Sequence, residues 1–158
     1  RDIARQLLRH RSFTFQEFSQ RYADPEDLDE TFVTREARLQ DPKNRQNSIE
    51  LDHDGPHFEY FSNLESAWVG KQQQIIHEAK LAYKWAIENG IAKEQARAVL
   101  PEGLTMSRLF VNGTIRSWVH YIQLRSGNGT QKEHIELAKA CANAIHSAFP
   151  MIDDFVQK

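Results

Sequence analysis

The sequence contains a single cysteine, Cys141, among its 158 residues. One cysteine excludes an intrachain disulfide and any zinc site that is built from several cysteines. No apolar run approaches the roughly 18 residues that a membrane-spanning helix needs, and no signal peptide is recognisable. From these absences we expect a cytoplasmic protein with no membrane partner.

An excess of positive charge is missing as well. Twenty Lys and Arg residues are balanced by 22 Asp and Glu residues, so the net charge does not indicate a nucleic-acid polymer as partner. The distribution is less even, because five arginines crowd the first 21 residues: Arg1, Arg5, Arg9, Arg11 and Arg21. A local cationic cluster in a nearly neutral protein suits a small anionic ligand better than a polyanion.

The length and the 40% hydrophobic content suit one domain with a real core. We predict a single domain over residues 1–158 of the α+β class, mainly helical, with long helices packed against short strands. Apolar periodicity predicts helices at about 1–10, 64–89, 93–100, 107–124 and 131–149. Residues 12–22 read as extended, and strand pieces are expected at 32–33 and 48–51.

Two of these helices carry an apolar stripe. In the helix at 64–89 the stripe is Trp68, Ile75, Ala79, Ala82 and Ala86, and in the helix at 131–149 it is Ile135, Ala138, Ala142, Ile145 and Phe149. Asn89-Gly90 is a good stop signal for the helix at 64–89. Thr130 with Glu133 predicts a capping box at the start of the last helix.

The stretch Arg9-His10-Arg11 to Tyr22 carries the most chemistry. In an extended chain the alternating Glu17, Ser19 and Arg21 share one face and would offer an acceptor, a hydroxyl and a guanidinium to one ligand. Arginine is suited to phosphate or to a polarised carbonyl, because its planar guanidinium can donate two parallel hydrogen bonds to one acceptor group. A solvated, charged turn would account for the same residues, and their chemistry alone does not distinguish such a turn from a ligand-binding segment.

Four ordered blocks resemble the flavin-dependent thymidylate synthases. Arg9-His10-Arg11, seven residues and then Ser19 match that family's signature. Gln95-Ala96-Arg97-Ala98-Val99-Leu100-Pro101 resembles its Arg-x-x-Leu-Pro element. Arg116-Ser117-Trp118-Val119-His120-Tyr121-Ile122-Gln123-Leu124-Arg125 is similar to its Arg-x-Trp-x-His-Phe and Leu-Arg helix, and Gln131-Lys132-Glu133 to the start of its closing helix.

The resemblance implies an FAD enzyme that methylates dUMP to dTMP, with methylenetetrahydrofolate as carbon donor and NADPH as reductant. It further implies a homotetramer whose sites combine residues from several subunits. Relatives begin with a further N-terminal segment, and we expect that segment to complete the sheet and the FAD and folate sites.

The resemblance also implies the site residues. Those expected around dUMP are Gln6, Arg9, Glu17, Ser19, Gln20, Arg21, Arg97 and Arg125, and those expected around FAD are Arg9, His10, Arg11, Glu17, Thr114, Arg116 and His120. Arg125 is the expected catalytic residue, because a guanidinium at the uracil edge would stabilise negative charge as the ring accepts hydride. No metal site is expected. Relatives often carry an asparagine at the position of Thr114 and a histidine near Gly129, so some flavin contacts must differ.

Weaker features have simpler explanations. Ser19 is read as a hydrogen-bonding residue, since no histidine is placed by sequence to activate it as a nucleophile. Cys141 is read as a buried helix residue. His53 and His57 flank Asp54-Gly55-Pro56 and are read as part of a turn rather than a metal site. Residues 127–130 could bind a phosphate at a helix N-terminus, although a plain cap explains them better.

A rival hypothesis of a different class is a non-catalytic helical module that binds nucleotide or RNA through the Arg1–Arg21 cluster. Such a module would lack flavin, and its binding would weaken steeply with salt.

Overall fold

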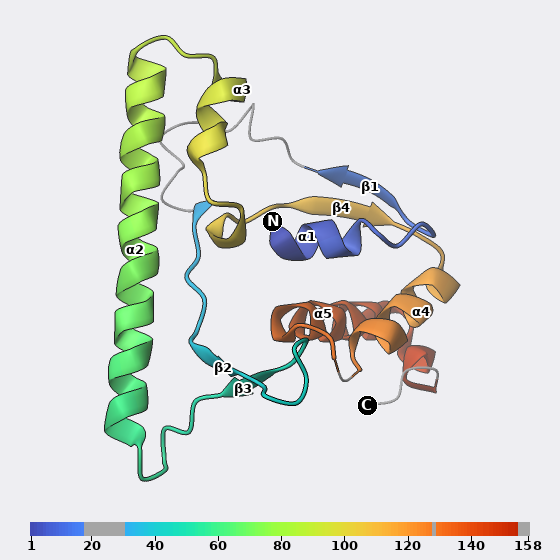
Figure 1. Ribbon diagram of the computed structural model, residues 1–158. Coiled ribbons are helices and arrows are strands. Elements are labelled where there is room, and N and C mark those ends of the chain that lie inside the picture. Colours follow the sequence, from blue (N-terminus) through green and yellow to red (C-terminus); the bar gives the residue numbers. More distant parts are fainter. Residues whose placement is uncertain (18–30, 128, 155–158) are drawn as a thin grey trace. The chain divides into compact units, whose positions relative to one another are not determined.

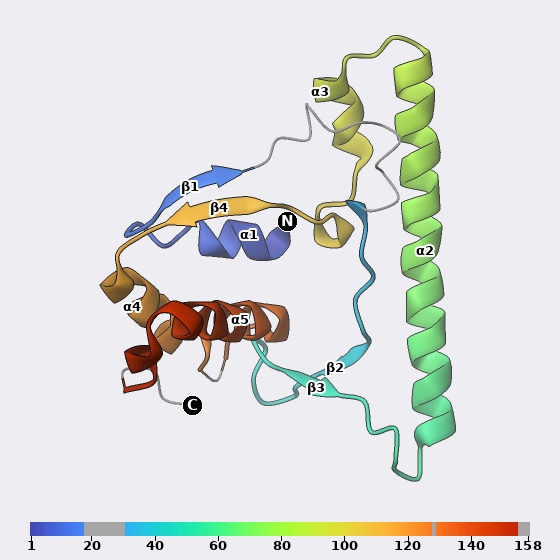
Figure 2. The same cartoon turned by 180° about the vertical axis from the view of Figure 1, so that it is seen from behind.

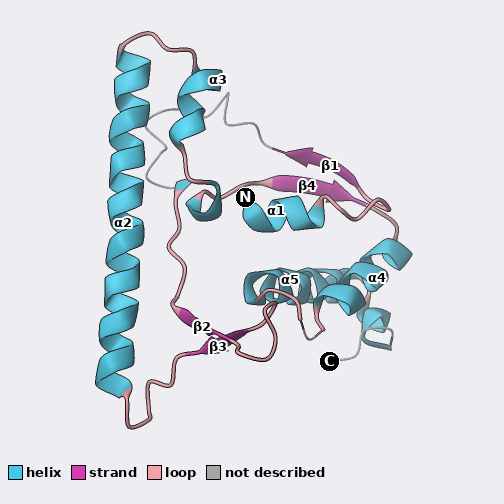
Figure 3. Ribbon diagram, viewed as in Figure 1, coloured by secondary structure: helices cyan, strands magenta, loops and turns pink. Residues whose placement is uncertain are grey.

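The computed structural model describes residues 1–17, 31–127 and 129–154. Its contacts divide the chain into two compact units. Unit 1 comprises Arg1–Asp2, Glu17–Leu39 and Glu50–Leu109, and unit 2 comprises Ile3–Gln16, Gln40–Ile49 and Phe110–Lys158. Helices dominate and the strands are short (Figure 3), so the predicted α+β class is confirmed. The single domain over residues 1–158 stays a prediction.

Unit 1 is organised by the long helix α2, Phe58–Glu88. Helix α3, Lys93–Ala96, follows it and continues into the 3-10 helices η2, Arg97–Val99, and η3, Glu102–Leu104. Tyr83 and Ala86 of α2 pack against Ala96, and this contact buries all three side chains. Figure 1 shows α3 beside the C-terminal end of α2.

The end of α2 confirms the predicted stop signal. Asn89 is the C-cap residue, and Gly90 has a φ of 75°, a left-handed conformation that glycine adopts without steric cost. The beginning differs from the prediction, since the helix starts at Phe58 rather than near residue 64. The turn at residues 52–57 that precedes it agrees with the interpretation of the His53–His57 segment.

The predicted stripe of α2 is buried only in part. Ala79 and Ala86 are buried, whereas Trp68 and Ile75 are 44% and 51% exposed. Gln72 is buried instead, because its amide satisfies the backbone of Arg35: it accepts from the Arg35 nitrogen at 2.7 Å and donates to the Arg35 carbonyl at 2.8 Å. Periodicity cannot detect a polar side chain that takes a core position in this way.

Two short sheets accompany the helices. Strands β2, Arg38–Gln40, and β3, Ser48–Glu50, form one pair, and β3 matches the strand piece expected at 48–51. Strands β1, Thr14–Glu17, and β4, Leu109–Asn112, form the other, so the extended conformation expected after residue 12 is confirmed as far as Glu17. Phe32 forms an isolated bridge with Thr105.

Unit 2 is built on helices α4, Ile115–Arg125, and α5, Lys132–Ala148, which lie side by side in Figure 1 and Figure 2. Helix α1, Asp2–Leu7, and the 3-10 helix η4, Pro150–Asp154, complete its helical part. Phe13 packs on Trp118, with ring centroids 4.6 Å apart, and on Tyr121 at 5.9 Å. Among the described residues, no helix is both long and apolar enough to cross a membrane.

One predicted helix start and one predicted cap in unit 2 are wrong. The helix expected from residue 107 begins only at Ile115, because Thr114 caps it by accepting a hydrogen bond from the Ser117 nitrogen at 3.2 Å. The residues before it form β4. The predicted capping box at Thr130 is absent, because Gln131 is the N-cap residue of α5 and makes no side-chain cap.

The last apolar stripe is also buried unevenly. Ala138 is 0% exposed, Ile135, Ala142 and Ile145 are half-buried, and Phe149 is 53% exposed. Cys141 lies in α5, as expected, but its side chain is half-buried rather than buried.

We expect Gly113→Ala to destabilise the protein. A β-carbon at this glycine would collide with the ring of Phe13, and overpacking of a core typically costs about 1–3 kcal/mol. Urea unfolding measures the change. Gly103→Ala is the matched control, because an added β-carbon there meets nothing within 4 Å. Equal stability of the two variants would contradict the prediction.

Candidate functional site

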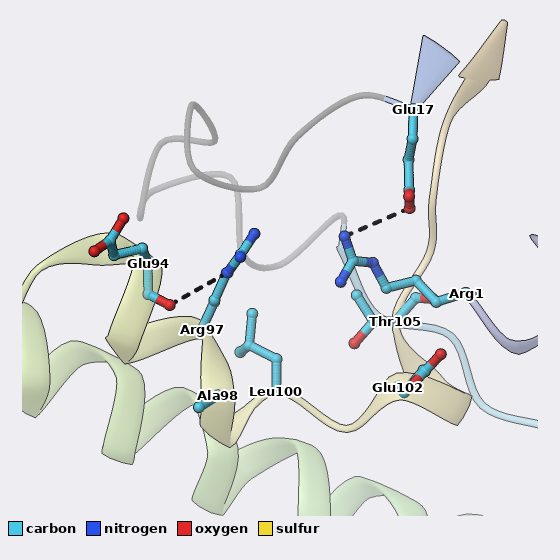
Figure 4. Close-up of a pocket in the computed structure, with 8 residues that line it drawn as sticks. All are labelled: Arg1, Glu17, Glu94, Arg97, Ala98, Leu100, Glu102 and Thr105. Carbon is cyan, nitrogen blue, oxygen red and sulfur yellow. Dashed lines mark hydrogen bonds and ion pairs between the residues drawn. The ribbon is translucent and has the colours of Figure 1, made fainter. Parts of the chain in front are cut away.

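A pocket of about 450 Å³ lies in unit 1. Ligand sites commonly have volumes of roughly 300–1,000 Å³. Its lining comes from the first residue, the end of β1, helix α3 and the segment after it, and consists of Arg1, Glu17, Glu94, Arg97, Ala98, Leu100, Glu102 and Thr105. Figure 4 shows the side chains of Arg1 and Arg97 extending toward each other from opposite sides of this pocket.

Arg97 is placed by the short helices that follow α2. It is the first residue of η2, and its Nε donates to the backbone carbonyl of Glu94 at 3.3 Å. This bond anchors the base of the guanidinium while the group extends into the pocket (Figure 4). The position of Pro101 after η2 fixes where the turn ends, since proline cannot continue a helical hydrogen-bond pattern.

Glu17 faces the pocket from the end of β1. Its carboxylate accepts a hydrogen bond from the Ser107 hydroxyl and pairs with an Nη of Arg1 at 3.5 Å. Glu17 and Arg97, two of the residues expected around dUMP, therefore line one pocket. Arg1 belongs to the cationic cluster seen in the sequence but was not expected around dUMP, and no motif marks Glu102.

A second cluster lies in unit 2, around Arg125. The guanidinium Nε of Arg125 donates to Nε2 of His10 at 3.0 Å. His10 is 9% exposed, and its ring meets Tyr121 edge-on at 5.0 Å. Burial lowers the pKa of His10, and the positive charge of Arg125 and the neighbouring His120 lower it further. A neutral ring that accepts at Nε2 carries its proton on Nδ1.

Helix α4 separates two kinds of side chain. Tyr121 and Ile122 are 0% exposed and Arg125 is half-buried, whereas Arg116 and His120 are exposed. Residues four apart lie on one face of a helix, so Arg116 and His120 share the outer face. Arg125 follows Tyr121 by four residues and shares the inner one.

The residues expected around FAD, apart from Glu17, all belong to unit 2. Arg9 and Arg11 are exposed in the turn after α1, and Arg116 is exposed on α4. Guanidinium groups bind phosphate oxygens through paired hydrogen bonds, so this donor set fits the diphosphate of a dinucleotide. Thr114 uses its hydroxyl as the cap of α4.

A hydrogen-bonded chain behind Arg125 was not anticipated. The Tyr121 hydroxyl lies 3.1 Å from Nε2 of His134, whose Nδ1 lies 3.2 Å from Oε1 of Gln6. The Gln6 amide nitrogen donates to Oε1 of Gln131 at 2.9 Å. Tyr121 and His134 are 0% exposed. The apolar stripe of α5 gave no sign that His134 would be buried.

Burial sets the protonation of this chain. It lowers the pKa of His134 to about 4, with further contributions from Arg125 and His10. Burial also raises the pKa of Tyr121 above its ordinary value, to which the Cys141 thiol adds. Both groups are therefore neutral at pH 7, and the chain consists of neutral hydrogen bonds.

Three expected site residues, Ser19, Gln20 and Arg21, lie outside the described residues. Their roles stay predictions, and so does the choice between hydrogen bond and nucleophile for Ser19. His53 pairs with Glu65 at 3.3 Å, and His57 is the N-cap residue of α2. Within residues 1–17, 31–127 and 129–154, no group of three His, Cys, Asp or Glu residues could hold a metal ion.

The fold matches a solved structure. The UMP/dUMP methylase PolB from Streptomyces cacaoi, bound with 5-Br UMP, aligns over 98% of this chain and 67% of its own with a TM-score of 0.73. At 22% identity the likeness concerns the fold.

Sequence comparison defines the family. The thymidylate synthase complementing protein family matches residues 1–151. A probable flavin-dependent thymidylate synthase of Paramecium bursaria Chlorella virus 1 is 46% identical over 96% of the chain, and the flavin-dependent thymidylate synthase of Synechocystis sp. is 43% identical over the same share. The chain spans 65% of the length of each. It therefore belongs to this family, and the resemblance in its motifs is confirmed.

We expect the free energy of unfolding to fall as the pH is lowered from 6.5 toward 4. In this window the unfolded chain protonates His134 while the folded protein, with a pKa of about 4, keeps it neutral. The difference amounts to about 3 kcal/mol near pH 4. Chemical denaturation at several pH values measures it.

His10, whose pKa is also lowered, adds to the same slope, so the comparison is made between variants. His134→Gln should show a smaller pH dependence than the wild type. The matched control is His77→Gln, because His77 is exposed on α2, and it should keep the full dependence. An unchanged slope in His134→Gln would refute the assignment.

Proposed function

We propose that the protein to which this chain belongs is an FAD-dependent enzyme that methylates dUMP to dTMP. In this proposal methylenetetrahydrofolate donates the carbon and NADPH is the reductant. The observation that carries the proposal is the hydrogen bond between Arg125 and a neutral, buried His10, within a chain of this family. The names of two relatives and the nucleotide bound by the structural neighbour support the choice of flavin and substrate.

Arginines carry the nucleotide binding in this proposal. Arg97 and Glu17 already line a pocket with the volume of a ligand site. Arg97 would bind an anionic part of dUMP through its terminal amino groups, since its Nε is held by the Glu94 carbonyl. Gln6, Arg9, Ser19, Gln20 and Arg21 are proposed as further contacts.

Arg125 is proposed as the catalytic residue. Its Nε is held by His10, so the plane of the guanidinium is fixed before substrate binds. Its terminal amino groups can then face the uracil edge and stabilise the negative charge that builds there. The flavin, when bound, supplies the hydride. His10 accepts from Arg125 only while it is neutral, which its burial favours.

The outer face of helix α4, together with the turn after α1 that holds Arg9, His10 and Arg11, is the proposed FAD site. Arg9, Arg11 and Arg116 would bind the diphosphate, and His10 and His120 would contact the flavin. Glu17 and Thr114 are proposed as further contacts. Because the chain spans 65% of its first relatives, we expect segments outside it to complete the FAD and folate sites.

Exposed apolar side chains on α2 support assembly. Leu81 and Trp85, four residues apart on one face of the helix, are 51% and 61% exposed, and contiguous exposed apolar surface is typical of an interface. We propose that the whole protein is a homotetramer whose sites combine residues from several subunits.

The whole protein should therefore purify yellow, with oxidised FAD, and as a tetramer. Absorbance in the visible range and light scattering measure the two properties. A colourless monomer would contradict the proposal. A colourless protein that binds RNA, with affinity falling steeply as salt rises, would instead favour the module built on the Arg1–Arg21 cluster.

Arg125→Lys should fail to replace arginine, because an ammonium group cannot reproduce the planar fork or the bond from Nε to His10. Loss of one preorganised donor typically lowers the rate by about 10²–10³. We expect that fall in dTMP formation, with NADPH oxidation by the flavin less affected. Arg45→Lys, at an exposed turn, is the control. Near wild-type dTMP formation at saturating dUMP would make Arg125 a binding contact only.

A further inference from the structure

We propose that Tyr121 and His134 are positioning residues for nucleotide binding, because they hold the side-chain amide of Gln6 in one orientation. The inference rests on the proposed function, in which Gln6 contacts dUMP. It concerns one chain of hydrogen bonds within unit 2, which runs from Tyr121 through His134 and Gln6 to Gln131.

This series of hydrogen bonds joins three helices. Gln6 lies in α1, Tyr121 in α4 and His134 in α5, and Gln131 is the residue immediately before α5. The three distances along it are 3.1, 3.2 and 2.9 Å. Tyr121 and His134 have no exposed surface, so water cannot replace either partner in their shared bond.

The direction of each hydrogen bond follows from the others. Because the Gln6 nitrogen donates to Gln131, the Gln6 oxygen faces His134 and can only accept. Nδ1 of His134 must then carry the proton, and in a neutral ring Nε2 is left to accept from the Tyr121 hydroxyl. The tautomer of His134 and the orientation of the Gln6 amide are thus coupled.

Turning the Gln6 amide over would require every other partner to change. Nδ1 would have to accept, Nε2 would have to donate to Tyr121, and Gln131 would have to present its own amide nitrogen. A mixed arrangement sets two donors or two acceptors against each other, and the low dielectric of the interior makes that costly. A charged His134 would not relieve it at neutral pH, because burial, and then the charges of Arg125 and His10, lower the pKa of its ring to about 4.

Packing alone does not explain these residue types. An apolar pair of similar size would fill the space between α4 and α5 without any group to satisfy, and buried polar networks are seldom better than apolar packing for stability. These hydrogen bonds hold the amide of Gln6, a half-buried residue of a short helix, from both sides. A preordered glutamine binds more tightly, because its side chain need not be ordered on binding.

The test measures dUMP binding to the FAD-loaded whole protein. Tyr121→Phe removes one hydroxyl and keeps the ring, and it releases Nε2 of His134. We expect the Kd for dUMP to rise about fivefold, the effect of one ordinary hydrogen bond. FAD content and NADPH oxidation should not change. Ile135→Val, next to His134 in α5 but without a polar group, should bind dUMP as the wild type does.

A double-mutant cycle separates positioning from general loosening. Gln6→Ala should weaken dUMP binding, and Tyr121→Phe should add nothing in that background. Unchanged binding by Tyr121→Phe, or an equal effect with and without Gln6, overturns the inference. Wild-type protein that binds no dUMP overturns the proposed function as well, whereas weakened binding by Gln6→Ala alone overturns only the role of Tyr121 and His134.

A measurement on the wild type covers the case in which Tyr121→Phe does not fold. Nitrogen NMR of the histidine rings should show His134 protonated at Nδ1 alone, and addition of dUMP should not change this. Two interconverting tautomers would overturn the inference.

Discussion

The hydrogen bond between Arg125 and His10 depends on keeping a histidine neutral beside a permanent cation. Burial achieves this, because it disfavours the charged ring, and the positive charge of Arg125 acts in the same direction. The edge-on contact with Tyr121 completes the enclosure of His10. The turn after α1 and the last turn of α4 are therefore joined by an interaction that tolerates only one protonation state.

A second histidine of unit 2 must also stay neutral. His134 lies in α5, and its pKa is lowered by burial and by the charges of Arg125 and His10. His10 thus disfavours the protonation of His134, although the two residues occupy different elements. Tyr121 contacts both rings, at 5.0 Å and 5.7 Å between centroids. Loss of the tyrosine ring would therefore affect both histidines, whereas loss of the hydroxyl alone would affect only His134.

Sequence reasoning succeeded where local chemistry decides the structure and failed where distant partners do. Asn89-Gly90 ended α2 as predicted, because a left-handed glycine stops a helix whatever surrounds it. Gln72 is buried at a position where apolar residues were expected, because its amide forms two hydrogen bonds with the backbone of Arg35, which is distant in sequence. Glu17 and Arg97 are 80 residues apart and line one pocket, although their roles around dUMP stay predictions. Tyr121 lies in one of the four matched blocks but had no expected role, and His134 lies in none of them, so only the 3.1 Å contact between their side chains links them.

Helix α4 has two faces that differ in how firmly their side chains are held. Its inner face carries Tyr121 and Arg125, whose polar atoms are held by buried partners, and its outer face exposes Arg116 and His120. The inner groups are fixed by packing, so their geometry does not depend on a ligand. The outer groups remain accessible and can follow one. In the proposed enzyme, this division places the residue that stabilises charge on the rigid face, and the residues that hold the cofactor on the adaptable one.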